Sequence, residues 1–200
     1  MPFESINFDY KLPKESINQN PYKNPNNSKL LIADTKEIIK FKEFNKIINS
    51  PSLFIMNKST VRNVRIQSKK KTEGTIEIFI LQILGNNIAK CLIRSTDRKV
   101  LNKKYELENF EFKIIKIENN TFHIHTNLAI NDIIDKYGKT PLPPYIEDNS
   151  KKYKYYNNQF SSGGFSVASP TAGLHFTNKQ IKNLKKLGHD FVYINLDVNV

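Results

Sequence analysis

The sequence has 200 residues, enough to bury a core as one domain or as two small ones. It is 38% hydrophobic with a mean hydropathy of −0.52, and no run approaches the roughly 18 apolar residues of a membrane span. Residues 1–10 lack the apolar stretch of a signal peptide, so we expect a cytoplasmic, globular protein without membrane attachment. The single cysteine, Cys91, excludes an internal disulfide and a multi-cysteine zinc site.

The net charge of +12 favours a polyanionic partner, with nucleic acid first and an anionic membrane surface second. Residues 51–100 hold ten Lys and Arg against three Asp and Glu. Biased composition would explain many of these lysines as solvated surface, but five basic residues lie within ten positions and are candidates for phosphate contact. These are Arg62, Arg65, Lys69, Lys70 and Lys71.

The first third of the chain predicts short elements of both types. Residues 29–34 have the composition of a short strand, and residues 42–49 place Phe44, Ile47 and Ile48 on one face of a short helix that Ser50-Pro51 ends. Residues 53–56 are continuously apolar, which predicts a strand buried between layers. Asn57 follows that strand, where α/β folds place ligands.

From residue 66 the pattern changes to short strands separated by polar turns. The candidates are residues 76–81, 88–94, 105–107, 110–117 and 121–125, and a helix over residues 131–137, capped by Asn131, follows them. We therefore expect an inserted small antiparallel β-barrel at residues 66–138. The fold class is α/β, with a layered α/β domain formed from both chain ends, residues 1–65 and 139–200. His123 and His125 share a strand face, but with no third ligand in range we predict no metal site.

Residues 166–177 are a run of small residues that leads into a helix start. Thr177 and Gln180 have the spacing of a capping box, helical apolar spacing follows, Gly188 ends the helix, and residues 191–194 predict a strand. Such a helix N-terminus suits a carboxylate, a phosphate or an electron-rich oxygen, but the residues alone favour an ordinary connection shaped by Pro170 and Gly173, because helix N-termini are more common than ligands bound there.

Two blocks resemble a known family. Residues 170–176, Pro-Thr-Ala-Gly-Leu-His-Phe, and residues 140–146, Thr-Pro-Leu-Pro-Pro-Tyr-Ile, resemble in type and order the signatures of the S-adenosylmethionine:tRNA ribosyltransferase-isomerases of queuosine biosynthesis. The opening at residues 8–13 and the segment at residues 57–66 are also similar to that family, the latter at Asn57, Val61 and Arg65. In residues 151–160 only Tyr153, with Lys152 for an arginine, matches the family pattern.

The resemblance implies a transferase-isomerase. The enzyme would transfer the ribosyl moiety of S-adenosylmethionine onto 7-aminomethyl-7-deazaguanine in tRNA and rearrange it, giving epoxyqueuosine, with S-adenosylmethionine as co-substrate and no permanently bound cofactor. His175 would be the acid/base. The substrate-binding candidates are Thr171, Ala172, Gly173, Asn57, Arg65, Pro144 and Tyr145, and those for nucleic acid are Arg62, Lys69, Lys70, Lys71 and Tyr153.

The resemblance runs to the end of the chain, whereas members of that family continue beyond the corresponding position. A chain shortened at its C-terminus is therefore expected, and a monomer is expected in solution. Two alternatives to an active enzyme stay open: a truncated inactive remnant, and a non-catalytic RNA-binding protein that uses the basic residues and tyrosines.

Overall fold

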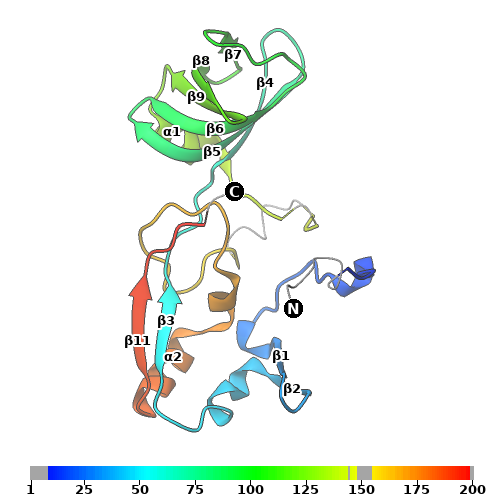
Figure 1. Cartoon of the computed structure of the whole chain (residues 1–200), viewed down its shortest axis with the longest axis vertical. Coiled ribbons are helices and arrows are strands. Elements are labelled where there is room, and N and C mark those ends of the chain that lie inside the picture. Colours follow the sequence, from blue (N-terminus) through cyan, green and yellow to red (C-terminus); the bar gives the residue numbers. More distant parts are fainter. Residues whose placement is uncertain (1–8, 144, 148–154, 199–200) are drawn as a thin grey trace, which may run out of the picture.

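The computed structural model describes residues 9–143, 145–147 and 155–198. Two parts follow each other along the longest axis of the molecule: a curled antiparallel sheet with one helix, and a part built around a pair of parallel strands (Figure 1). The described residues form a mixed α/β protein, as the α/β class predicted, with a seven-stranded antiparallel sheet, a two-stranded antiparallel sheet and a two-stranded parallel sheet.

The larger sheet has seven strands in the order β10-β4-β5-β6-β9-β8-β7, and every pairing in it is antiparallel. All five strands expected between residues 76 and 125 are present, and two short ones join them at the ends of that region. The strands are β4 (Arg65–Lys69), β5 (Thr75–Gly85), β6 (Ile88–Arg94), β7 (Lys104–Glu106), β8 (Glu111–Glu118), β9 (Thr121–Thr126) and β10 (Gly138–Lys139).

The sheet curls until strands far apart in its order meet at one end. The peptide N–H of Lys71 donates to the Glu106 carbonyl at 3.0 Å, and that of Glu108 donates to the Lys69 carbonyl at 3.2 Å. Lys70 and Leu107 form an antiparallel bridge between the same segments. These contacts hold the end of β4 against β7.

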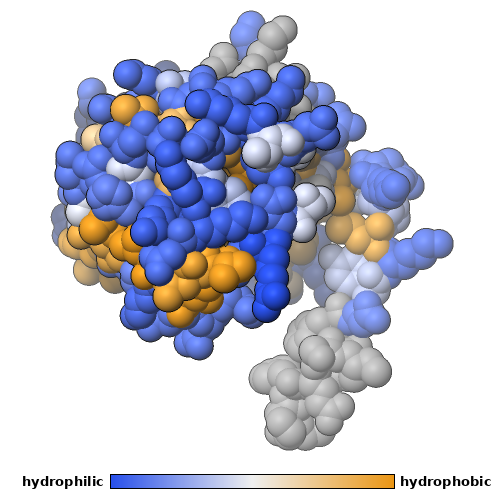
Figure 2. All heavy atoms as spheres, turned by 90° about the horizontal axis from the view of Figure 1, so that it is seen from above, coloured by the Kyte–Doolittle hydropathy of each residue, from blue (hydrophilic) through white to orange (hydrophobic). Residues whose placement is uncertain are grey.

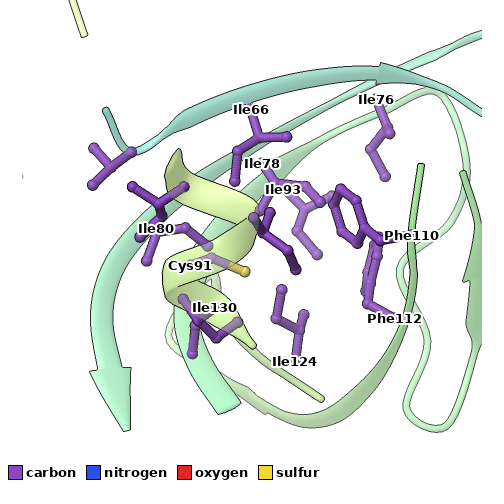
Figure 3. Close-up of a cluster of buried hydrophobic side chains, with 14 of the residues drawn as sticks. Ile66, Ile76, Ile78, Ile80, Cys91, Ile93, Phe110, Phe112, Ile124 and Ile130 are labelled. Atoms are coloured by element: carbon purple, nitrogen blue, oxygen red, sulfur yellow. The ribbon is translucent and has the colours of Figure 1, made fainter. Parts of the chain in front are cut away.

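The concave side of this sheet contains the larger of two hydrophobic clusters. Ile76, Ile78 and Ile80 alternate along β5 and are each 1% exposed, the period expected when one face of a strand is buried (Figure 3). Helix α1 (Ile130–Tyr137) adds Ile130, Ile133 and Ile134 to the same cluster.

The start of α1 differs from the prediction. Ala129 is the N-cap and Asn131 lies inside the first turn, where its side chain accepts a hydrogen bond from Arg62. Asn131 is therefore not a cap, because Ile130 already has helical geometry and its N–H donates to the Asn86 carbonyl. The Ile133 N–H donates to the Ala129 carbonyl, so no side chain caps this helix.

The segment before the parallel sheet forms a hairpin. Strand β1 (Lys29–Ile32) was expected, but its antiparallel partner β2 (Glu37–Lys40) was not. Lys36 has a φ of 58° in the turn between them, a conformation that the sequence does not signal with glycine or asparagine. Short 3₁₀ helices η2 (Lys14–Ser16) and η3 (Pro25–Asn27) precede the hairpin, and η4 (Phe41–Lys46) stands where a helix over residues 42–49 was predicted.

Strands β3 (Leu53–Asn57) and β11 (Asp190–Ile194) form the parallel pair, and helix α2 (Asn178–Lys186) precedes β11. Phe54, Met56, Phe191 and Tyr193 face the second hydrophobic cluster, which contains Phe41, Phe176, Ile181 and Leu184. The expectation that residues 53–56 are buried on both sides is wrong, because Leu53 is 59% and Ile55 64% exposed. In the described residues, only one face of this pair is covered.

Candidate functional site

Three chain segments meet beyond the carboxyl ends of β3 and β11. The N–H of Ser162 donates to the Lys58 carbonyl, and those of Thr60 and Arg62 donate to the carbonyls of Gly163 and Ser166. The N–H of Val167 then donates to the Val198 carbonyl. Residues 58–62, 162–167 and 196–198 are thus tied together at the end of the sheet where α/β proteins bind ligands.

Asn57 holds two of these segments with its side-chain amide. Its Nδ2 donates to the Leu196 carbonyl at 2.8 Å, and its Oδ1 accepts from the N–H groups of Leu196 and Ser59 at 3.2 and 3.0 Å. Because Oδ1 accepts two backbone hydrogen bonds and Nδ2 donates one, most of the hydrogen-bonding capacity of the Asn57 amide holds the backbone, so Asn57 mainly shapes the site.

The block at residues 170–176 contains a 3₁₀ helix, η6 (Thr171–His175), where the sequence predicted a loop. Thr171 and Ala172 are exposed, and His175 is half-buried. The His175 ring packs against Phe41, with 5.4 Å between the ring centroids. Within the described part of the chain, neither of its ring nitrogens has a hydrogen-bond partner, so neither is committed to another protein group.

Gly173 is where the block contacts the rest of the site. A β-carbon at this position would lie 2.9 Å from both Asn158 Nδ2 and Phe160 Cζ. Asn158 is 7% exposed and donates to the Asn57 carbonyl, while its Oδ1 accepts from the Ser161 hydroxyl. Glycine lets η6 lie close against Asn158 and so connects the block to the end of β3.

The N-terminus of α2 is capped largely by the protein itself. The Thr177 hydroxyl accepts from the N–H of Gln180 at 3.2 Å, as predicted, and Gln159 Oε1 accepts from the N–H of Asn178 at 2.9 Å. The Gln180 side chain turns away from the cap and donates to the Phe41 carbonyl. Only one of the two hydrogen bonds expected of a capping box therefore forms. The interpretation of residues 166–177 as an ordinary connection explains this helix start well.

Arg65 lies on the other sheet, at the first position of β4. Its Nε and Nη2 are 2.8 and 2.7 Å from Glu77 Oε2. Burial raises the pKa of the Glu77 carboxyl, but hydrogen bonds from Gln67 and Arg65, with the charges of Arg65 and Arg94, outweigh it and hold the pKa below its usual value. A paired Arg65 is less available to a substrate than the sequence suggested.

The basic residues predicted for phosphate contact have unequal surroundings. Lys70 has a side chain only 7% exposed, and its Nζ is 2.7 Å from Asp97 Oδ1, so it stabilises the loop after β6. Lys71 is 57% exposed with a distant partner in Glu106 at 3.9 Å. Arg62 donates to Asn131 and lies over the Phe165 ring, with 5.7 Å from its Cζ to the ring centroid.

Lys69 lines an open cavity of about 760 Å³ where the ends of β4 and β6 lie beside the start of β5. Arg94 and the carboxylates Glu77 and Glu108 share its lining with neutral polar side chains. Seen from above in Figure 2, hydrophilic side chains cover most of this end of the molecule, with hydrophobic patches between them. Of the predicted phosphate contacts, Lys69, Lys71 and Arg62 retain an accessible charge, whereas Lys70 does not.

Two predicted site residues, Pro144 and Tyr153, lie outside the described residues. Tyr145 is 59% exposed, and its carbonyl accepts a hydrogen bond from Gln19 Nε2 at 2.9 Å. Gln19 Oε1 also accepts from the N–H of Glu147, so the N-terminal segment holds residues 145–147 in place.

His123 and His125 both lie on β9, His125 exposed and His123 half-buried beside Glu118 at 3.6 Å. Among the described residues, no group of three or more His, Cys, Asp or Glu side chains could hold a metal ion. Cys91 is fully buried, and burial raises the pKa of its thiol. In the same part of the chain, no helix has the length and apolar character needed to span a bilayer.

Sequence reasoning missed three residues at the strand ends. Asn158 is hidden in a run rich in asparagine, lysine and tyrosine, where no spacing separates it from its neighbours. Asp197 accepts from the Phe165 N–H at 2.9 Å, and Ser59 is fully buried with no hydrogen-bond partner for its Oγ among the described residues. A β-carbon on Gly164 would lie 2.6 Å from Asp197 Oδ1 and 2.9 Å from Ser59 Oγ, which explains the glycine there.

Comparison with known proteins gives consistent matches. The family described as queuosine biosynthesis protein matches residues 5–200. S-adenosylmethionine:tRNA ribosyltransferase-isomerases from a Sulfurihydrogenibium species and from Vesicomyosocius okutanii are 34% and 33% identical to this chain. Each match covers 96% of this chain and 60% or 58% of the relative, so the chain spans about three fifths of the length of these relatives.

A solved structure, the S-adenosylmethionine tRNA ribosyltransferase from Thermotoga maritima, is 25% identical over 96% of this chain and 58% of its own. Its TM-score is 0.38, too low to support a conclusion about the fold. The sequence matches alone carry the assignment: this chain belongs to the queuosine biosynthesis protein family.

Proposed function

We propose that this chain forms the S-adenosylmethionine-binding part of a tRNA ribosyltransferase-isomerase. The substrates would be S-adenosylmethionine and 7-aminomethyl-7-deazaguanine in tRNA, and the product epoxyqueuosine. Family membership and the names of the relatives support this proposal. The structural observation that carries it is the position of η6, which Gly173 and Asn158 hold against the carboxyl end of β3.

His175 is the proposed acid/base of this site. The sulfonium of S-adenosylmethionine makes the neighbouring ribose C–H acidic, so the reaction needs a base, and the departing adenine needs a proton. Imidazole serves either role near neutral pH. The unpaired ring nitrogens of His175 and its packing on Phe41 suit a positioned proton carrier. The exposed Thr171 and the Gly173 backbone would orient a ribose or carboxylate group.

The architecture we propose for the complete enzyme is a layered α/β domain from residues 1–65 and 139–200, with residues 66–138 as an inserted barrel. The two separate hydrophobic clusters support this division. Val167 is an exception to this division. The residue belongs to residues 139–200, but its side chain packs in the hydrophobic cluster of the curled sheet. The two proposed domains therefore contact each other through Val167.

The proposed macromolecular partner is tRNA, bound by a cytoplasmic monomer. The net charge of +12 and the accessible Lys69, Lys71 and Arg62 support an anionic partner. Tyr145, exposed and held by Gln19, is a candidate for stacking on an unpaired base.

Calorimetric titration of the purified chain with S-adenosylmethionine, alongside circular dichroism, tests the proposal. Saturable binding by a folded chain is expected, and a Gly173→Val variant should lose it because the new side chain would displace Asn158. If a folded chain binds tRNA in a salt-dependent manner but never binds S-adenosylmethionine, the protein is an RNA-binding module without this chemistry. A chain that binds neither and unfolds without cooperativity is an inactive remnant.

A further inference from the structure

Helix α2 carries a stripe of lysines that has no acidic counterpart. Four of its nine residues are lysines and none is acidic, whereas the whole chain has 31 lysines and arginines among 200 residues. Lys182 and Lys186 follow Lys179 by three and seven positions, so the three exposed side chains share the face opposite the second hydrophobic cluster. This face is here called the lysine stripe. Among the described residues, none of the three has an ion-pair partner.

The lysine stripe is unfavourable for the helix itself. Lysines three or four positions apart on a helix repel each other, and Lys182 has this spacing to both Lys179 and Lys186. Lys179 also lies in the first turn, where the helix dipole disfavours a cation. The last turn favours Lys185 and Lys186, and Lys185 Nζ lies 5.8 Å from the centroid of the Phe191 ring. Ordinary helix stabilisation therefore explains the last-turn lysines but not Lys179 and Lys182.

The position of the stripe favours RNA as the anion that relieves this repulsion. Residues 176–178 alone separate His175 from Lys179, so the stripe begins where the proposed site ends. A tRNA with one nucleotide at His175 extends beyond it, and the stripe offers charge over about 10 Å for the following phosphates. An anionic membrane fits less well, because a helix on a membrane turns its apolar face to lipid, and that face of α2 packs inside the protein.

We propose that the lysine stripe of α2 binds the phosphate backbone of tRNA beside the reacting nucleotide. The choice of tRNA rests on the proposed function. The stripe adds a contact surface next to η6 to the one expected around Lys69 and Lys71 at the end of β4. Because the contact is electrostatic, it is measured without S-adenosylmethionine.

Removing two charges from the stripe tests the contact. In the double variant Lys179→Gln/Lys182→Gln, the slope of log affinity for unmodified tRNA against log salt should fall by about two, measured by fluorescence anisotropy. The unfolding midpoint should stay the same or rise, because a repulsion is removed. The control is Lys113→Gln/Lys136→Gln, which removes two exposed lysines from β8 and α1 and should keep the wild-type slope. A wild-type slope in the α2 variant, or an equal fall in the control, would overturn the proposal.

Crosslinking locates the RNA without removing any lysine. Asn183 is exposed on α2, and an Asn183→Cys variant labelled with a photoreactive maleimide should crosslink to bound tRNA. Cys91 is buried and the pKa of its thiol is raised, so the introduced thiol is the one that reacts. Leu84→Cys, at an exposed position of β5, should give no crosslink.

Two further measurements separate the alternatives. Binding to vesicles of phosphatidylcholine and phosphatidylserine that the α2 double variant loses, with no tRNA crosslink at residue 183, would overturn the proposal and assign the stripe to a membrane. Calorimetry with S-adenosylmethionine tests the proposed reaction independently. A tRNA crosslink in a chain that never binds S-adenosylmethionine would support the stripe and contradict the reaction. S-adenosylmethionine binding with an unchanged salt slope in the double variant would overturn the stripe alone.

Discussion

His175 combines a sequence match with a position that only the structure reveals. The residue ends η6, packs on Phe41 and keeps both ring nitrogens without a partner in the described part of the chain. Asn57, in contrast, matches the family pattern equally well, but its side-chain amide is hydrogen-bonded to the backbone of Leu196 and Ser59. Similarity to a family pattern therefore does not separate residues without a hydrogen-bond partner, such as His175, from residues that hold the backbone, such as Asn57.

Replacing His175 by glutamine should separate binding from chemistry. Glutamine retains polar atoms but carries no titrating proton, so S-adenosylmethionine binding by calorimetry should persist while turnover falls. The loss expected in a full-length relative carrying the matching change is about 100-fold or more, the usual contribution of a positioned acid/base. His125→Gln, on the exposed end of β9, is the control. Unchanged turnover in the His175 variant would remove this residue from the mechanism.

Gly138 is required by the close approach of two backbones. A β-carbon there would lie 1.9 Å from the Asn63 carbonyl oxygen and 2.3 Å from that of Ile134. Gly138→Ala should therefore lower the free energy of unfolding by about 1–3 kcal/mol, measured by urea denaturation. Gly85→Ala is a matched control in β5, where the nearest atom would be 3.9 Å away. Equal stability of the two variants would show that the backbones of residues 63 and 138 can move apart without a loss of stability.

At the scale of elements, ion pairs on the curled sheet connect its strands. Arg65 on β4 pairs with Glu77 on β5, and Lys70 pairs with Asp97 beyond β6. Both basic residues belong to the cluster predicted to contact phosphate, and these ion pairs make their charges less available to a phosphate. The register between strands decides this, and no local sequence pattern reports it.

The Glu77 pair predicts a dependence of stability on pH. Because the folded-state pKa is below the unfolded value of about 4.3, the pair contributes stability above that pH and loses it as the pH falls through the lower folded value. Glu77→Gln should thus reduce stability at pH 7 and flatten its decline in acid, measured by urea denaturation between pH 7 and pH 3. Glu108→Gln, at an exposed position, should preserve the wild-type profile.

Lys69 and Lys70 should respond oppositely to substitution. Lys69→Ala removes an accessible charge, so the slope of log affinity for tRNA against log salt should fall by about one while stability is kept. Lys70→Met breaks its pair with Asp97, so the unfolding midpoint should fall while the salt slope is kept. Fluorescence anisotropy at several salt concentrations and thermal denaturation distinguish the two. A smaller slope for Lys70→Met than for Lys69→Ala would contradict the assignment.

Over the whole molecule, burial is distributed unevenly between the two sheets. The curled sheet and α1 enclose the larger hydrophobic cluster, whereas the parallel pair packs on the smaller cluster with one side and exposes Leu53, Ile55, Val192 and Ile194 on the other. Regions with fewer buried apolar contacts open at lower free energy. The part that holds the proposed catalytic site is thus the less stable of the two.

Hydrogen exchange should therefore differ between the sheets. Amides of β3 and β11 are expected to exchange faster than those of β5 and β6 by about ten-fold or more, since each 1.4 kcal/mol of local stability corresponds to a factor of ten. Mass spectrometry of peptides from both sheets provides the measurement. Equal protection in both would indicate one cooperative unit that the shared packing of Val167 is sufficient to couple.

The sequence by itself determined the strands of the curled sheet, helix α2 and the family. Alternating apolar residues identify the strands of the curled sheet, and the Thr177 cap and Gly188 bound the helix region, because these signals depend on neighbours within one turn or one strand. The blocks at residues 140–146 and 170–176 likewise carry the family resemblance without any long-range information.

Tertiary structure alone decided which groups are free and which faces are covered. Asn57 and Arg65 hydrogen-bond to partners 139 and 12 residues away, and Ile55 is exposed although its strand is continuously apolar. Partners of this kind depend on topology and on strand register, which a local sequence segment does not specify. The exposed face of β3 and β11 could not be predicted for the same reason. An apolar strand sequence predicts burial, but it does not say which element covers the strand.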